Sequence, residues 1–138
     1  HLDMLAPMEG AEGLLRLLAV RGVYLGVVSN TLGEHLRREV AHLGWGDLFG
    51  GVVGANDAVR DKPSSQPVVL ALSGSDITPG GDVWLVGDTG IDLECARNAG
   101  CQGILIRQTR PHPGEFDGCE PAAHYSDCED MVALVRAL

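Results

Sequence analysis

The chain has 138 residues, of which 45% are hydrophobic and 19 are glycine, so we expect a single domain over residues 1–138 with a real core. Its formal net charge of −9 argues against binding to nucleic acid or anionic membranes. The apolar runs are too short to cross a bilayer and no signal peptide is visible, so we expect a cytoplasmic protein.

Helices and strands are predicted to alternate along the chain. Helical spacing of apolar residues with glycine stops marks the helices, and short apolar runs mark the strands. In chain order the pattern predicts a helix over residues 10–21, a strand over 23–28, a helix over 32–43, a strand over 51–55, a helix over 67–73, a strand over 83–87, a helix ending at residue 99, a last strand over 104–107 and a helix over 127–137. Residues 108–125 are predicted to be loop, and Ser126 with Glu129 to cap the last helix. This order predicts an α/β fold with a parallel sheet and functional groups at the carboxyl ends of its strands.

The four cysteines form no CxxC pair, which argues against a redox motif or a zinc ribbon. Cys95 and Cys101 are expected to pack in the core. An alternative metal site can be drawn from the other two cysteines and two histidines, namely Cys119, Cys128, His112 and His124. Their irregular spacing in a proline-rich segment makes this the weaker interpretation, because metal ligands need a specific geometry.

Polar residues follow the strand predicted over 23–28. The hydroxyl, amide and backbone N–H groups of Ser29, Asn30 and Thr31 could cradle a phosphate beside the start of the next helix. The same residue types are favoured at helix N-caps, so a capping role explains them as well.

Lys62 follows the strand predicted over 51–55 and is the only lysine beside nine arginines. Pro63 favours an extended conformation at Lys62, and a lysine offers a compact charge for a phosphoryl group. The alternative is a solvated charge in a loop.

The strand predicted over 83–87 ends at Asp88, and Asp92 falls in the first turn of the next helix. Two neighbouring carboxylates at a strand end favour a hard cation such as Mg²⁺. Each residue also has a structural explanation. Aspartate is common in turns, which would explain Asp88, and a negative charge is favourable at the start of a helix, which would explain Asp92.

With these motifs in this order, the chain from about residue 7 resembles the haloacid dehalogenase-like superfamily and, within it, the phosphoglycolate-phosphatase-like hydrolases. The resemblance implies a three-layer α/β/α Rossmann-like core. It implies that Ser29, in VVSNT with Asn30 beside it, hydrogen-bonds the transferred phosphoryl group, and that Lys62, in DKPSSQP, balances phosphate charge and steadies the nucleophile. In VGDTGID, it implies that Asp88 ligates Mg²⁺ and that Asp92 binds the metal or orients its shell.

The chain departs from this family at the first motif. Family members open with a strand ending in DxDxT, whose first Asp attacks phosphorus, yet no DxD occurs anywhere here. Asp3 is the only upstream candidate, and we do not assign it as nucleophile. Because residues 7–10 resemble the point where the family's chain re-enters the core after a helical cap, we expect the first strand and the cap to be missing.

The missing strand lies in related folds between the strands that carry Ser29 and Asp88. Its loss leaves two strand edges that need partners. We expect either that the two strands close up and pair directly, or that a missing N-terminal segment or a second chain completes the sheet.

Three functions follow from these observations. The first is a Mg²⁺-dependent phosphatase for a small phosphorylated metabolite, in which this chain lacks the nucleophile, is inactive alone and binds Mg²⁺ weakly. The second is a non-catalytic remnant that binds phosphate or a protein through exposed strand edges. The third, ranked last because its acidic pair would have to come first, is a receiver-like phosphoacceptor domain.

Overall fold

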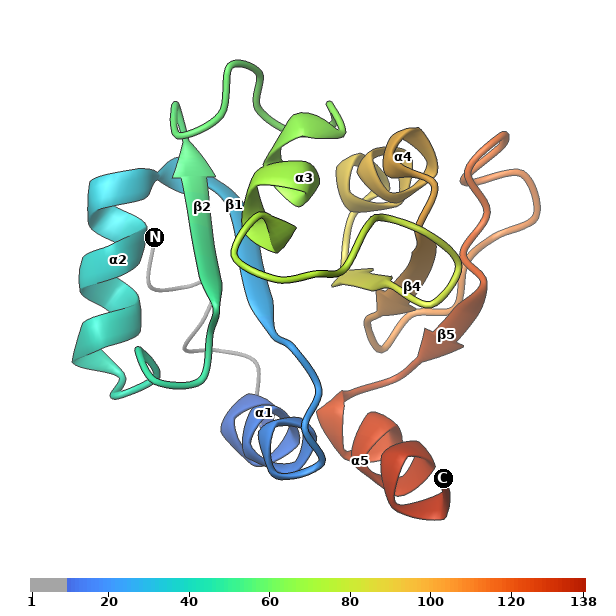
Figure 1. Ribbon diagram of the computed structural model, residues 1–138. Coiled ribbons are helices and arrows are strands. Elements are labelled where there is room, and N and C mark those ends of the chain that lie inside the picture. The colour runs from blue at the N-terminus through green and yellow to red at the C-terminus, as the bar shows by residue number, and fades with distance from the viewer. Residues whose placement is uncertain (1–9) are drawn as a thin grey trace.

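The computed structural model describes residues 10–138, so Asp3 and residues 7–9 lie outside the described residues. Its elements are α1 (Ala11–Val20), β1 (Gly26–Leu32), α2 (Gly33–His42), β2 (Gly51–Ala55), α3 (Gln66–Leu72), β3 (Trp84–Gly87), α4 (Gly90–Ala99), β4 (Gln102–Ile106), β5 (Ala123–Tyr125) and α5 (Cys128–Ala137). The predicted alternation of strands and helices is confirmed, and Figure 1 shows the strands with helices packed around them. No helix in the described part is long and apolar enough to cross a membrane.

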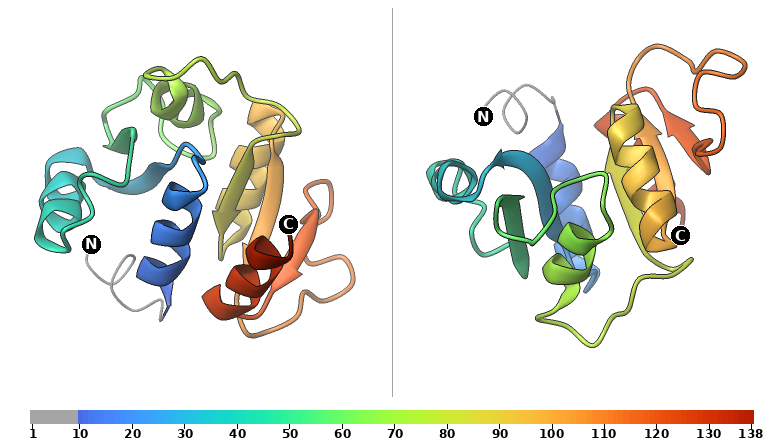
Figure 2. Two further views of the ribbon diagram at one scale, coloured as in Figure 1. Left: turned by 60° about the horizontal axis from the view of Figure 1, so that its bottom comes forward. Right: turned by 90° about the horizontal axis from the view of Figure 1, so that it is seen from above.

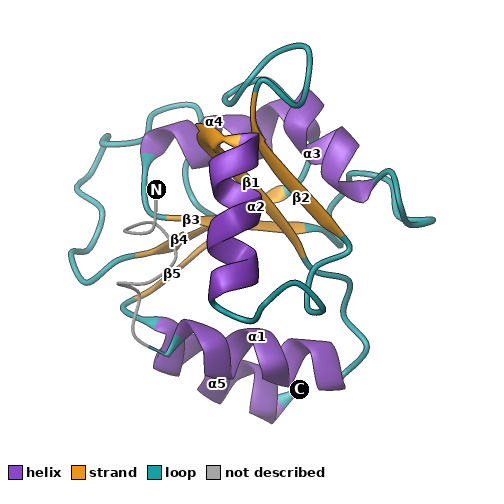
Figure 3. Cartoon of the chain, turned by 90° about the vertical axis from the view of Figure 1, so that its left-hand side faces the viewer, coloured by secondary structure: helices purple, strands orange, loops and turns teal. Residues whose placement is uncertain are grey.

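All strand pairs are parallel, as predicted, but they form two sheets. One sheet has the order β1-β2, with Val28 opposite Val53. The other has the order β3-β4-β5, with Gly87 opposite Leu105. The two sheets run in different directions (Figure 3). The expectation that the Ser29 and Asp88 strands pair directly is therefore wrong for the described residues; completion of the sheet by a further segment stays a prediction.

The segment predicted as loop over residues 108–125 contains β5 at its end. This strand has three residues and pairs with β4 through Ile104 opposite Ala123 and Ile106 opposite Tyr125. Three residues are too few to show a strand period in the sequence. The strand over 104–107 is consequently not the last one.

The last helix begins one residue later than predicted, and its cap is Asp127 rather than Ser126. Asp127 has extended backbone and its Oδ1 accepts a hydrogen bond from the Asp130 N–H at 2.9 Å. The negative charge of the Asp127 carboxylate also interacts favourably with the positive end of the helix dipole, an interaction that a neutral serine hydroxyl lacks.

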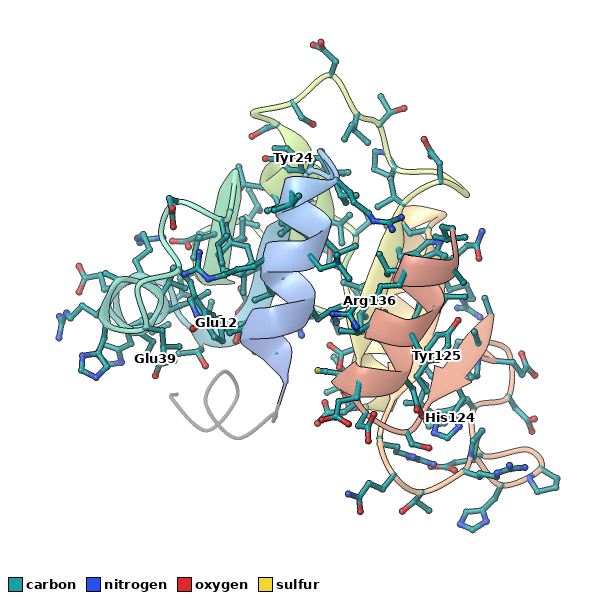
Figure 4. All side chains as sticks on the ribbon, turned by 90° about the horizontal axis from the view of Figure 1, so that it is seen from below. Glu12, Tyr24, Glu39, His124, Tyr125 and Arg136 are labelled. Carbon is teal, nitrogen blue, oxygen red and sulfur yellow. The ribbon has the colours of Figure 1, made fainter. Side chains whose placement is uncertain are left out.

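Helices α1 and α5 lie side by side and cover one face of the β3-β4-β5 sheet (Figure 2). Between them is a buried apolar cluster made of Leu14, Ile104, Ile106, Cys128, Met131 and Val135. Seen from below, Glu12 lies on the side of α1 that faces α2 (Figure 4), and its carboxylate accepts a hydrogen bond from Trp45 at 2.9 Å. Helix α1 is thus bound both to α5 and to the segment after α2.

Candidate active site

Asp92, at the third position of α4, organises the turn between β3 and that helix. Its Oδ2 accepts hydrogen bonds from the Asp88 N–H at 3.2 Å, the Thr89 N–H at 3.3 Å and the Thr89 hydroxyl at 3.0 Å. Thr89 is the N-cap of α4 and forms a capping box with Asp92. The turn that carries Asp88 is therefore fixed by one carboxylate.

The other oxygen of Asp92 binds Lys62. Nζ of Lys62 lies 2.6 Å from Oδ1, and the two side chains are only 7% and 11% exposed. A buried charge needs an opposite charge and hydrogen bonds. Asp92 has both, with Lys62 on Oδ1 and three donors on Oδ2.

The segment with Lys62 is attached to α4 at two further points. The Cys95 thiol donates to the Ser64 carbonyl at 3.3 Å, and the Asn98 amide donates to the Pro63 carbonyl at 2.8 Å. Together with Asp92, these residues recur every three positions and so lie along one face of the helix. Neither Cys95 nor Asn98 was predicted in this role from the sequence; their spacing from Asp92 was the available signal.

The close approach of Asp92 to β3 requires a glycine at position 87. A Cβ built there would lie 2.3 Å from the Asp92 carboxyl group. Any larger residue would push the carboxylate away from its donors.

Asp88 differs from Asp92 in being exposed and in having no side-chain hydrogen bond or ion pair among the described residues. Its oxygens are available to a ligand, as Mg²⁺ coordination requires. Asp92 fits the second role implied for it, that of orienting the metal shell, because its lone pairs already accept protein donors. The donor set thus fits a divalent cation with one free carboxylate.

Ser29, Asn30 and Thr31 form a second cluster, inside the last part of β1. The strand was predicted over residues 23–28 but runs from Gly26 to Leu32, so these residues do not follow it as expected. The pairing of β1 becomes irregular after Val28. Ser29 is 6% exposed and its Oγ accepts a hydrogen bond from the Thr31 N–H at 3.1 Å, while Asn30 is exposed. The capping interpretation of these residues is wrong, because the N-cap of α2 is Leu32, with no side-chain hydrogen bond.

The cysteines have structural surroundings. Cys95 is fully buried, as predicted, and burial raises the pKa of its thiol to about 11, so the thiol beside Lys62 is neutral. Cys101 is only partly buried. Cys128 packs in the α1–α5 cluster. Over residues 10–138, no group of three or more His, Cys, Asp or Glu residues could hold a metal, which includes the alternative site drawn with Cys119.

Comparisons with known proteins identify the family. The sequence model of one protein family, the haloacid dehalogenase-like hydrolases, matches residues 1–106. The chain is 32% identical to a phosphoglycolate phosphatase from Pectobacterium atrosepticum over 88% of its own length and 51% of the relative's. It is 30% identical to an N-acetylmuramic acid 6-phosphate phosphatase from Pseudomonas aeruginosa, over 78% and 47%. The chain thus spans about half the length of these curated relatives.

Solved structures show the same fold. A haloacid dehalogenase-superfamily hydrolase from Ehrlichia chaffeensis superposes with a TM-score of 0.81 at 29% identity, over 95% of this chain and 58% of that one. The Bacillus subtilis hydrolase YfnB, solved with magnesium, has a TM-score of 0.77 at 15% identity, over 93% and 55%. This chain belongs to the haloacid dehalogenase-like hydrolases.

Proposed function

We propose that this chain is the phosphate- and metal-binding part of a Mg²⁺-dependent phosphatase that acts on a small phosphate monoester. The observation that carries the proposal is the Lys62–Asp92 pair at 2.6 Å, which fixes a turn with one free carboxylate, Asp88. The two similar phosphatases named above act, by their names, on phosphoglycolate and on a sugar phosphate. They support a small phosphorylated metabolite as the substrate class.

In the proposed reaction an Asp carboxylate attacks phosphorus, the bond from phosphorus to the substrate oxygen breaks, and water then hydrolyses the aspartyl phosphate. Ser29, Asn30 and Thr31 would hold the phosphoryl oxygens through hydroxyl, amide and N–H donors. Lys62 would balance their charge, and Asp88 would ligate Mg²⁺, which neutralises charge on the transferred group. Asp92 would keep Lys62 and Asp88 in place.

The attacking Asp would come from a segment that this sequence does not contain, since it has no DxD. The strand edges support such a segment. Trp84 and Val86 of β3, at one edge of their sheet, remain 42% and 40% exposed. An added parallel strand between β1 and β3 would pair with both and cover these side chains.

An extended chain tests the proposal. A strand ending in DxDxT and a helical cap are joined before His1, and hydrolysis of p-nitrophenyl phosphate is measured with and without Mg²⁺. We expect Mg²⁺-dependent turnover that Asp88→Asn and Lys62→Met abolish. Asp82→Asn is the matched control, because Asp82 is an exposed carboxylate at the other end of β3. An extended chain that folds but remains inactive would contradict the proposal.

The second candidate is a non-catalytic module that binds phosphate or a protein partner, favoured by the exposed apolar residues on β3. Hydrolysis by the 138-residue chain alone would exclude it. For the chain alone we expect weak Mg²⁺ binding, since only one carboxylate is free; tight stoichiometric binding by calorimetry would contradict this.

A further inference from the structure

The carboxyl end of β1, where residues 29–31 bulge out of the pairing with β2 just before α2, is held in place by a residue that the sequence pattern did not single out. This bulged end of β1 is called the turn below. We propose that Asp57 is a positioning residue, and that its carboxylate, ion-paired with Arg37, fixes the turn that carries Ser29, Asn30 and Thr31. The inference rests on the phosphate-binding role proposed for this turn. Asp57 itself need not touch the phosphate.

The chain after β2 turns back sharply and so brings Asp57 to the end of that strand. Asn56 has a φ of 70°, in the left-handed region, and the Asp57 N–H donates to the Gly54 carbonyl at 3.2 Å. The Asn56 N–H donates to the Asp61 carboxylate at 2.9 Å, which holds the same turn from its other side. As a result, Oδ2 of Asp57 accepts a hydrogen bond from the Gly54 N–H at 2.8 Å.

From this position Asp57 lies directly against the first residue of α2. A Cβ built on Gly33 would be 2.4 Å from both carboxylate oxygens of Asp57. A Cβ on Gly54 would be 2.4 Å from the Thr31 carbonyl oxygen. The two glycines therefore allow the end of β2 to pack on the turn backbone itself, with no side chain between them.

Arg37 completes the contact from α2. Its Nη1 lies 2.8 Å from Oδ2 of Asp57 and its Nη2 lies 3.4 Å from Oδ1. Arg37 follows Gly33 by one helical turn, so both residues are on the same face. The guanidinium, and then the Gly54 N–H, lower the pKa of Asp57, which keeps the carboxylate charged near the positive end of α2.

This arrangement places a carboxylate beside the uncapped start of α2. Leu32 makes no side-chain capping bond, and the first turn of α2 has one acidic residue of its own, Glu34; Asp57 brings a second carboxylate to this end of the helix from the β2 side. Donors for a phosphate must be preorganised, because ordering them on binding reduces affinity. Removing the charge from Asp57, or its partner Arg37, should therefore loosen the turn and weaken phosphate binding.

Hydrogen exchange and a titration with inorganic phosphate, both followed by NMR, test the inference on the 138-residue chain. The variants are Asp57→Asn and Arg37→Gln. Arg16→Gln is the matched control, because Arg16 and Arg37 are 48% and 50% exposed and each pairs with one carboxylate. We expect the amides of residues 31–34 to exchange about tenfold faster in both variants, the size of one charge-assisted hydrogen bond. Amides of β4 should keep their protection from exchange. Arg37→Lys should exchange more slowly in the turn than Arg37→Gln, because the lysine keeps the positive charge.

Each outcome decides the matter. Unchanged exchange in the turn, or equal changes in Arg37→Gln and Arg16→Gln, would overturn the inference. So would a loosened turn that binds phosphate as tightly as the wild type does. A loosened turn in a chain whose wild type binds no phosphate would support the positioning of the turn by Asp57 and contradict the proposed function. If Asp57→Asn does not fold, Arg37→Gln carries the test alone, because Arg37 is half exposed.

Discussion

The Lys62–Asp92 ion pair should be the most strongly coupled pair of charges in the described part of the chain. The two side chains are 7% and 11% exposed and their charged atoms are 2.6 Å apart. Lys62→Met removes the cation while keeping a side chain of similar length. Asp92→Asn removes the negative charge and keeps an oxygen for the donors of the Asp88 turn.

The magnitude follows from what each change leaves behind. Breaking a buried pair by removing one partner costs about 3–5 kcal/mol, since the remaining charge is uncompensated. In Lys62→Met the Asp92 carboxylate keeps three donors on Oδ2, so we expect a loss near the lower limit, about 3 kcal/mol. Asp92→Asn leaves Lys62 with no carboxylate at that position. The double variant leaves no buried charge and should be more stable than the sum of the single changes predicts.

Urea unfolding of the wild type, both single variants and the double variant gives the coupling energy. We expect about 2 kcal/mol or more for this pair. For the exposed Arg16–Glu12 pair, whose side chains are 48% and 56% exposed, we expect less than about 0.5 kcal/mol. A Lys62–Asp92 coupling as small as this control would refute the conclusion that the pair holds the site together.

Three further predictions concern the surroundings of the site. Gly87→Ala should destabilise the fold by about 1–3 kcal/mol in urea unfolding, because the new Cβ overlaps the Asp92 carboxyl group. Gly81→Ala is the control and should leave stability unchanged, because a Cβ at Gly81 has no atom within 4 Å. Equal losses of stability in the two variants would contradict the overlap at Gly87. Arg107 lies 2.6 Å from the Glu115 carboxylate and lowers its pKa from 4.5 to about 2, so Glu115 contributes stability above pH 4.5 that is lost as the pH falls toward 2. The stability difference between wild type and Glu115→Gln should therefore disappear over that range; a constant difference would argue against the pair. Cys95, fully buried with a thiol pKa of about 11, should react with a disulfide reagent at pH 8 only as the protein unfolds, and rapid native labelling would exclude its contact with the Ser64 carbonyl.

The sequence predicted the local elements well because each has its own pattern. The strand over 51–55 and the glycine that ends α4, Gly100 with a φ of 74°, are where they were expected. The division into two sheets could not be predicted, because strand pairing depends on contacts between segments far apart in sequence. The same reason hid β5, which exists only through its pairing with β4.

The sequence proposed individual site residues but could not give the contacts between them. Ser29, Lys62 and Asp88 were proposed from strand ends and from the single lysine, and their roles stay predictions. The partner of Lys62 could not be derived, since a sequence does not show which of two nearby carboxylates a lysine reaches. Asp57 was missed for a related reason: its role depends on the left-handed turn at Asn56, and nothing in the local pattern distinguishes it from a loop charge.

Because Asp92 already binds protein donors, few oxygen ligands remain for a metal at the turn after β3. Lys62 balances the charge of Asp92 and three donors bind its second oxygen, so Asp88 alone adds an uncompensated negative charge there. Mg²⁺ prefers six oxygen ligands and gives up water reluctantly. One carboxylate on an exposed turn is a weak site for Mg²⁺, and a second carboxylate beside it would raise the affinity. The proposed segment with the attacking carboxylate would supply such a donor, so metal affinity and catalytic activity should appear together in a chain extended by that segment.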